Sequence, residues 1–152
     1  MIDIASSIKT VISNTINWTE DDPVSTSVSF TLDEMDPKNP TLQVLLENGA
    51  SKFTFVTYDY YKIEQDCKIT LYVRPVNYME STITAYKTTF LNAKTQIDKI
   101  LASKKFSISN LASVDPGGWK DIDMEVGRDT KKFHNEPIVF VSEQVVKVIY
   151  YD

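Results

Sequence analysis

The stretch that decides the fold is KFTFVTYDYYKIEQDCKITLYVR, residues 52–74. It is rich in aromatic and β-branched residues, and apolar and polar residues alternate in its second half, which is typical of strands with one buried face. We expect two strands, over residues 52–61 and 67–74, joined by the polar connection IEQD at residues 63–66. This hairpin predicts an antiparallel sheet at the centre of the fold.

Two shorter strands are expected before this hairpin. Residues 27–32 alternate between apolar and hydroxyl side chains, and residues 42–46 form a short apolar run. Residues 33–40, DEMDPKNP, have the composition of an exposed loop, and residues 47–50, ENGA, that of a turn. Together these segments predict an antiparallel meander of three or four strands.

One long helix follows, over residues 81–105. Apolar residues recur there at steps of three and four, a narrow stripe suited to lying across a sheet. The stripe consists of Ile83, Tyr86, Phe90, Ala93, Ile97 and Ile100. Asn77 and Glu80 have the spacing of a capping box, in which each side chain satisfies a free backbone N–H at the helix start. We therefore expect this helix to begin close to Asn77.

The two ends of the chain complete the pattern. A first amphipathic helix is expected because Ile4, Ile8, Val11, Ile12 and Ile16 share one helical face. After the long helix, residues 107–118 are expected to form a loop that ends in the turn DPGG, and the residues from Trp119 to Val126 alternate like a strand. Residues 127–136 are a polar connection, and two last strands are expected over residues 138–141 and 145–151.

Helices and strands are thus segregated along the chain and do not alternate as in a doubly wound nucleotide-binding fold. The length of 152 residues suits one domain with a sizeable core. We predict a single α+β domain over residues 1–152, with an antiparallel or mixed sheet, an N-terminal helix and one long helix packed on the sheet.

Composition excludes several classes of function. The net charge of −5 argues against a tight binder of the outer face of nucleic acid. The single Cys67 excludes an internal disulfide and a zinc site built on paired cysteines, and its alternating surroundings predict a buried core thiol. His134 is the only histidine, and no phosphate loop or catalytic motif is found, so we expect no enzyme, cofactor or metal.

No apolar run suggests a membrane span and the N-terminus lacks the pattern of a secretion signal, so we expect a cytoplasmic location or a particle assembled there.

A row of carboxylates, Asp121, Asp123 and Glu125, is the most unusual local feature. On a strand the three side chains would project from one face and repel one another unless cations, water or basic partners screen them. They can form the solvated face of an edge strand, an acidic surface for a channel or an interface, or a divalent-cation site. We favour the solvated face, followed by the acidic surface.

A group of tyrosines, Tyr58, Tyr60, Tyr61 and Tyr72, is open to three interpretations. They can belong to the core, to an interface between subunits, or to a ligand site, because tyrosine rings stack and their hydroxyls form hydrogen bonds. Core packing and an interface are the favoured interpretations.

The layout of the whole chain resembles the tail terminator, or tail-completion, and neck proteins of long-tailed bacterial and archaeal viruses. The resemblance is based on the N-terminal helix ending in INW at residues 16–18, on the meander followed by the long helix, and on the C-terminal part. There, the tryptophan strand GWKDIDMEVGRD at residues 118–129 leads to the last strand VVKVIYYD at residues 145–152. The loop over residues 33–40 has no counterpart that we recognise in that family.

Membership of such a family implies a virion structural protein, assembled in the host cytoplasm, that forms a homo-oligomeric ring, often a hexamer. The ring would cap the tail tube, contact the tail tube protein and neck or connector proteins, and let DNA pass without sequence-specific binding. An acidic channel lining would repel phosphates, and Asp121, Asp123 and Glu125 are candidates for it. Strand edges are candidate joints between subunits, with interface residues Tyr58, Tyr60, Tyr72, Val146, Val148 and Tyr150.

Two other functions remain as alternatives. One is a non-enzymatic module that binds a carbohydrate or a peptide through a tyrosine-rich sheet face. The other is an unfamiliar enzyme that uses the carboxylate row with a divalent metal.

Overall fold

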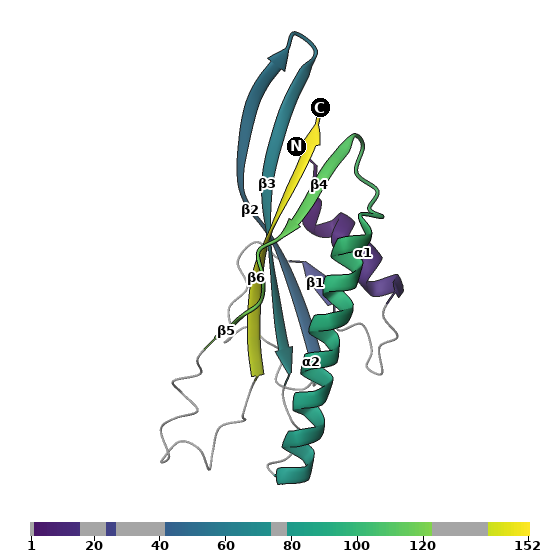
Figure 1. Ribbon diagram of the computed structural model, residues 1–152, viewed down its shortest axis with the longest axis vertical. Coiled ribbons are helices and arrows are strands. Elements are labelled where there is room, and N and C mark those ends of the chain that lie inside the picture. The colour runs from purple at the N-terminus through teal and green to yellow at the C-terminus, as the bar shows by residue number, and fades with distance from the viewer. Residues whose placement is uncertain (1, 16–23, 27–41, 74–78, 123–139) are drawn as a thin grey trace.

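The computed structural model of the protein describes residues 2–15, 24–26, 42–73, 79–122 and 140–152, and Figure 1 shows their arrangement. These residues form two helices and a six-stranded sheet with the strand order β1-β2-β3-β6-β4, in which β5 also pairs with β6. Both helices contribute to one core against one face of the sheet. The predicted α+β class, with an N-terminal helix and a long helix on the sheet, is confirmed.

The strands form a mixed sheet. β1 (Val24–Thr26) runs parallel to β2 (Leu42–Thr57). The other pairs are antiparallel: β2 pairs with β3 (Tyr60–Val73), and β3 pairs with β6 (Phe140–Tyr151). On its other side, β6 pairs with β4 (Leu111–Pro116) and β5 (Lys120–Asp121). The last strand, β6, is therefore an interior strand that has neighbours on both sides. Its side chains alternate between buried and exposed along most of its length, because the helices cover one face of the sheet.

The central hairpin is longer than the sequence predicts. β2 and β3 are continuous strands, and they are joined by a two-residue turn at Tyr58 and Asp59. The expected hairpin connection at residues 63–66 is wrong, because Ile63 and Gln65 are buried on one face of β3 while their neighbours are more exposed. The polar sequence IEQD is part of a strand. This is possible because the buried Gln65 has hydrogen-bond partners, Asn48 and Tyr150.

The expected turn at residues 47–50 is a β-bulge. Asn48 pairs with Cys67 and Ser51 pairs with Gln65, so two residues of β2, Gly49 and Ala50, lie opposite the single residue Asp66. An added Cβ at Gly49 would lie 3.1 Å from the Cβ of Asp66, which favours glycine there. The residues that predicted a turn therefore form a bulge within a continuous strand.

The two helices bury the apolar stripes that the sequence predicts. α1 (Ile4–Thr15) buries Ile4, Ile8 and Ile12, and Val11 is partly buried against the same core. α2 (Glu80–Ser103) buries Phe90, Ala93, Ile97, Ile100 and Leu101, with Tyr86 packed at the border. The capping box is wrong, because the residue before the first turn is Met79, whose side chain makes no capping hydrogen bond, and Glu80 is the first helical residue.

The C-terminal third contains more strand than expected. Residues 111–116, expected in a loop, form β4 along β6, and the two expected last strands are one strand, β6. Ser142 and Gln144 looked like a break, but both are buried polar residues within β6. Between β4 and β5 the chain passes so close to β6 that a Cβ at Gly117 would lie 2.4 Å from the Val145 carbonyl oxygen.

Several expectations concern residues outside the described ranges. They are the strand at residues 27–32, the loop at residues 33–40, the polar connection at residues 127–136, Asn77 of the capping box, and His134. Asp123 and Glu125 of the carboxylate row also lie outside the described residues.

Candidate functional site

The most unusual surface feature is the end of the β2–β3 hairpin, residues 53–61, which we call the aromatic tip. Figure 1 shows this end of the hairpin projecting beyond the other strands and both helices. The exposed fractions are 95% for Tyr58 and between 45% and 60% for the other five large apolar side chains. These are Phe53, Phe55, Val56, Tyr60 and Tyr61. So many exposed apolar side chains on one short segment mark an interaction surface.

The aromatic rings of the tip contact one another. The ring centroid of Phe55 lies 5.9 Å from that of Tyr61 and 6.4 Å from that of Tyr58, and both contacts are edge-to-face. Edge-to-face pairs are favourable arrangements of aromatic rings. Phe55 therefore links the two strands of the hairpin just below the turn.

The rings of Phe53, Phe55 and Tyr61 continue the face of the sheet that the helices cover. Phe53 pairs with Ile63 and Phe55 pairs with Tyr61, and Ile63 belongs to the main core. β2 reaches this register only because the bulge at Gly49 and Ala50 shifts its side-chain alternation by one residue. Val44 and Leu46 before the bulge and Phe53 and Phe55 after it consequently share one face.

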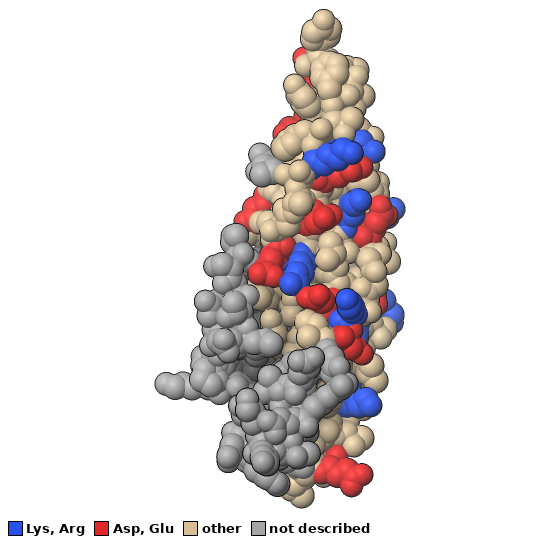
Figure 2. Space-filling model, turned by 90° about the vertical axis from the view of Figure 1, so that its left-hand side faces the viewer, with Lys and Arg blue, Asp and Glu red and all other residues tan. Residues whose placement is uncertain are grey.

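The tip has very little charge. Figure 2 shows an end with few charged atoms above strands on which Lys, Asp and Glu are interspersed. Asp59, in the turn, is the only charged residue between Phe53 and Tyr61. Lower on the hairpin, Lys62 and Glu64 lie 3.4 Å apart, and Lys68 and Glu143 lie 3.1 Å apart.

The predicted tyrosine group is divided by the structure. Tyr58, Tyr60 and Tyr61 are on the aromatic tip, whereas Tyr72 is buried at the other end of β3 in a small cluster with Leu45 and Val141. Burial also raises the pKa of the Tyr72 hydroxyl. The four tyrosines therefore do not form one binding surface.

The candidate interface residues of the last strand lie in the core. Val146, Val148 and Tyr150 are each 0% exposed, and β6 is paired on both sides. An interior strand offers no free edge for strand addition, so this candidate joint is wrong. Of the predicted interface residues, Tyr58 and Tyr60 are the two that are exposed.

The carboxylate row is described only at Asp121. Its exposed carboxylate accepts a hydrogen bond from Lys94 Nζ at 2.5 Å, and this contact holds the pKa of Asp121 below its usual value. Lys94 also lies over the ring of Phe90, 4.4 Å from its centroid. Asp121 thus attaches β5 to α2.

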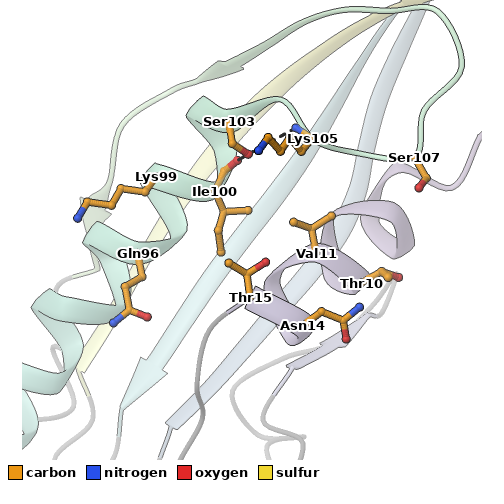
Figure 3. A pocket seen from close by; sticks show the side chains of 10 residues that line it. All are labelled: Thr10, Val11, Asn14, Thr15, Gln96, Lys99, Ile100, Ser103, Lys105 and Ser107. Carbon is orange, nitrogen blue, oxygen red and sulfur yellow. Dashed lines mark hydrogen bonds between the residues drawn. The ribbon is translucent and has the colours of Figure 1, made fainter.

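A groove of about 730 Å³ lies between α1 and α2 (Figure 3). In Figure 3 Val11 and Thr15 of α1 and Ile100 of α2 face the gap, while Lys99 extends away from α1. Lys105 lines the groove beyond the end of α2. The other lining residues carry hydroxyl or amide groups, and they are Thr10, Asn14, Gln96, Ser103 and Ser107.

The helix groove is positively charged. Among the described residues, its lining contains Lys99 and Lys105 and no carboxylate. Within the described part of the chain, neither lysine forms an ion pair. In a protein with a net charge of −5, this surface favours an apolar ligand that carries negative charge.

Chemically reactive groups are scarce among the described residues. Cys67 is 0% exposed, and burial raises the pKa of its thiol to about 12, so the predicted core thiol is confirmed. No group of three or more His, Cys, Asp or Glu residues in the described ranges lies close enough together to hold a metal ion. Neither described helix is long and apolar enough to cross a membrane.

Comparison of the sequence with protein-family models and with characterised proteins finds no match. The aromatic tip and the helix groove are therefore interpreted from their own geometry.

Sequence reasoning missed part of this surface. It identified Tyr58, Tyr60 and Tyr61 but not Phe53 and Phe55. Without knowledge of the bulge, the alternation of β2 side chains between the two faces cannot be followed past Gly49. The available signal was the density of aromatic residues around Asp59 in a segment that contains no other charge.

Proposed function

We propose that this chain is a structural subunit that assembles with copies of itself through the aromatic tip. The observation that supports the proposal is the projection of the tip beyond the core with six large apolar side chains at least 45% exposed. Exposing such a patch to water is unfavourable unless a partner covers it. The enrichment of aromatic side chains is also characteristic of protein interfaces.

We further propose that the assembly is a ring of the tail terminator or neck type at a viral head–tail junction. This part of the proposal comes from the resemblance in sequence layout. A ring requires a head-to-tail interface in which each subunit offers two different surfaces. A projecting hairpin suits one half of such an interface, because it can reach past the body of its own subunit.

Binding of a carbohydrate or a peptide by a tyrosine-rich face has less support. Tyr72 is buried apart from the other tyrosines, and the exposed rings are on a convex tip. Small-molecule sites are usually concave.

The test compares the mass of the purified protein with that of variants of the tip. Light scattering after size-exclusion chromatography should show a concentration-dependent oligomer, and negative-stain microscopy should show closed rings, if necessary after co-expression with tail tube subunits. Phe55→Ser and Tyr58→Ser should each weaken association while leaving the folded protein intact.

Leu91→Ser is the matched control, because Leu91 is 52% exposed but lies on α2, away from the tip. Its association should equal that of the unmodified protein. A chain that stays monomeric alone and with tube subunits, or whose association is unaffected by both tip substitutions, contradicts the proposal.

A further inference from the structure

We propose that the aromatic tip of one copy docks into the helix groove of the next copy, so that these two surfaces form the head-to-tail joint of the assembly. The inference depends on the proposed self-assembly through the tip, and it identifies the surface that receives the tip. The occupant of the groove is a second copy of this chain.

The electrostatics of the two surfaces are complementary. The turn of the tip carries Asp59 as its only charge, and the described residues that line the groove include Lys99 and Lys105 and no carboxylate. Within the described residues, none of these three side chains has an ion-pair partner in its own chain. Opposite unpaired charges on two surfaces steer their encounter and fix the orientation of docking.

The apolar and polar parts of the two surfaces also correspond. Val11 and Ile100 provide apolar contact for the rings that flank Asp59, Tyr58 and Tyr60. Hydroxyl and amide side chains around them, such as Asn14 and Gln96, can form hydrogen bonds with the tyrosine hydroxyls. The groove volume of about 730 Å³ is within the range in which protein pockets enclose compact ligands, roughly 300–1,000 Å³.

The positions of the surfaces produce a head-to-tail contact. The tip is at the end of the β2–β3 hairpin, whereas the groove lies between the two helices against the body of the sheet (Figures 1 and 3). Because the two surfaces differ and lie apart, one copy can donate its tip and accept another at the same time. Repetition of this contact produces a ring if the rotation closes, and a filament otherwise.

Charge reversal gives a direct test. Asp59→Lys places a lysine opposite Lys99 and Lys105, and the double substitution Lys99→Glu with Lys105→Glu places two carboxylates opposite Asp59. Each protein alone should associate at least about tenfold more weakly than the unmodified chain at low salt. An equimolar mixture should recover association, because every tip then meets a groove of opposite charge in an alternating assembly.

A matched control makes the same change in net charge as the groove double substitution, but at positions outside the groove. Lys87→Glu with Lys120→Glu alters two exposed lysines that do not line the groove. This control should associate like the unmodified chain, and because its groove keeps Lys99 and Lys105 it should not accept the substituted tip of Asp59→Lys. Circular dichroism and urea unfolding establish that each variant is folded before its association is compared.

The outcomes separate the inference from the proposed function. If tip substitutions abolish association but the groove double variant associates normally, or if the mixture does not recover, the helix groove is not the receptor and the inference is wrong. The inference is also wrong if the tip binds only a different protein, or if the groove binds only small anions. If tip substitutions leave association unchanged, the proposed function itself is wrong.

Discussion

The side-chain amide of Asn48 donates a hydrogen bond to the carboxylate of Asp3 across 2.8 Å, although the two residues are 45 positions apart. Asp3 precedes α1 and also accepts a bond from the Ser6 backbone N–H at 3.1 Å, as an N-cap does. The side-chain oxygen Oδ1 of Asn48 accepts a hydrogen bond from the Ala5 N–H at 3.0 Å. One asparagine beside the bulge of β2 therefore fixes the start of the first helix.

Replacing Asn48 with Ala should destabilise the protein by about 1–3 kcal/mol, because it removes the acceptor of the Ala5 N–H and of Nε2 of the buried Gln65. Urea unfolding followed by circular dichroism measures the loss. Asn92→Ala is the control, since Asn92 is an exposed residue of α2 and should change stability by less than about 0.5 kcal/mol. Equal stability of the two variants would show that the Asn48 bridge contributes little.

The same pair predicts a dependence on pH. Hydrogen bonds from Asn48 first, and then from Ser6, lower the pKa of Asp3 from its usual value of 3.8. A carboxyl whose pKa is lower in the folded state stabilises that state above its unfolded pKa, and the contribution is lost as the pH falls through the folded pKa. The stability difference between the unmodified chain and Asp3→Asn should therefore be constant above about pH 5 and narrow below pH 3.8. A difference that does not change between pH 5 and pH 2 would contradict this assignment.

The helical part of the fold was predictable from the sequence, because the apolar stripes of Ile4 to Ile12 and of Phe90 to Ile100 depend only on spacing within one segment. The strand boundaries were not. Gly49 suggested a turn but belongs to a bulge, and the real turn at Tyr58 and Asp59 contains none of the glycine or asparagine that usually marks a tight hairpin.

Buried polar residues account for the other errors. Gln65, Ser142 and Gln144 looked like connections between strands, but each is buried within a strand. Gln65 has partners on Asn48 and Tyr150, and Gln144 has one on Asp98, all far away in the sequence. The sequence alone cannot reveal such partners. The candidate site was likewise predicted only in part: its three tyrosines were identified, but the bulge that sets the orientation of Phe53 and Phe55 was not.

Gly117 should be sensitive to substitution for a steric reason. The Cβ of Gly117→Ala would approach the Val145 carbonyl oxygen to 2.4 Å, so β4 must move away from β6 at a cost of about 2–3 kcal/mol. Gly118→Ala is an informative comparison, because nothing lies within 4 Å of its Cβ and only its φ of +83° opposes a side chain. That strain costs about 1–2 kcal/mol. Urea unfolding should rank Gly117→Ala as the less stable variant, and the reverse order would refute the close approach of the two strands.

Asp98 and Gln144 should depend on each other energetically. Asp98 Oδ1 accepts hydrogen bonds from Trp119 Nε1 at 2.8 Å and from Gln144 Nε2 at 3.1 Å, and these bonds connect α2 to the sheet. Gln144 is 2% exposed, and its Oε1 has no partner in the described part of the chain. Removing Asp98 would therefore leave a buried amide with neither end satisfied, and Asp98→Ala should cost about 1–3 kcal/mol.

A double-mutant cycle tests this dependence. Gln144→Met removes the unsatisfied oxygen and keeps an unbranched side chain of similar length, so alone it should change stability by less than about 1 kcal/mol. In the Gln144→Met background, Asp98→Ala no longer leaves a buried amide without a partner. Its loss of stability should therefore be smaller than in the unmodified chain by about 0.5–2 kcal/mol. Urea unfolding of the four proteins gives the coupling energy. A coupling near zero would mean that Gln144 is not held by Asp98 in solution, whereas the expected value shows that α2 is fixed on β6 through this amide.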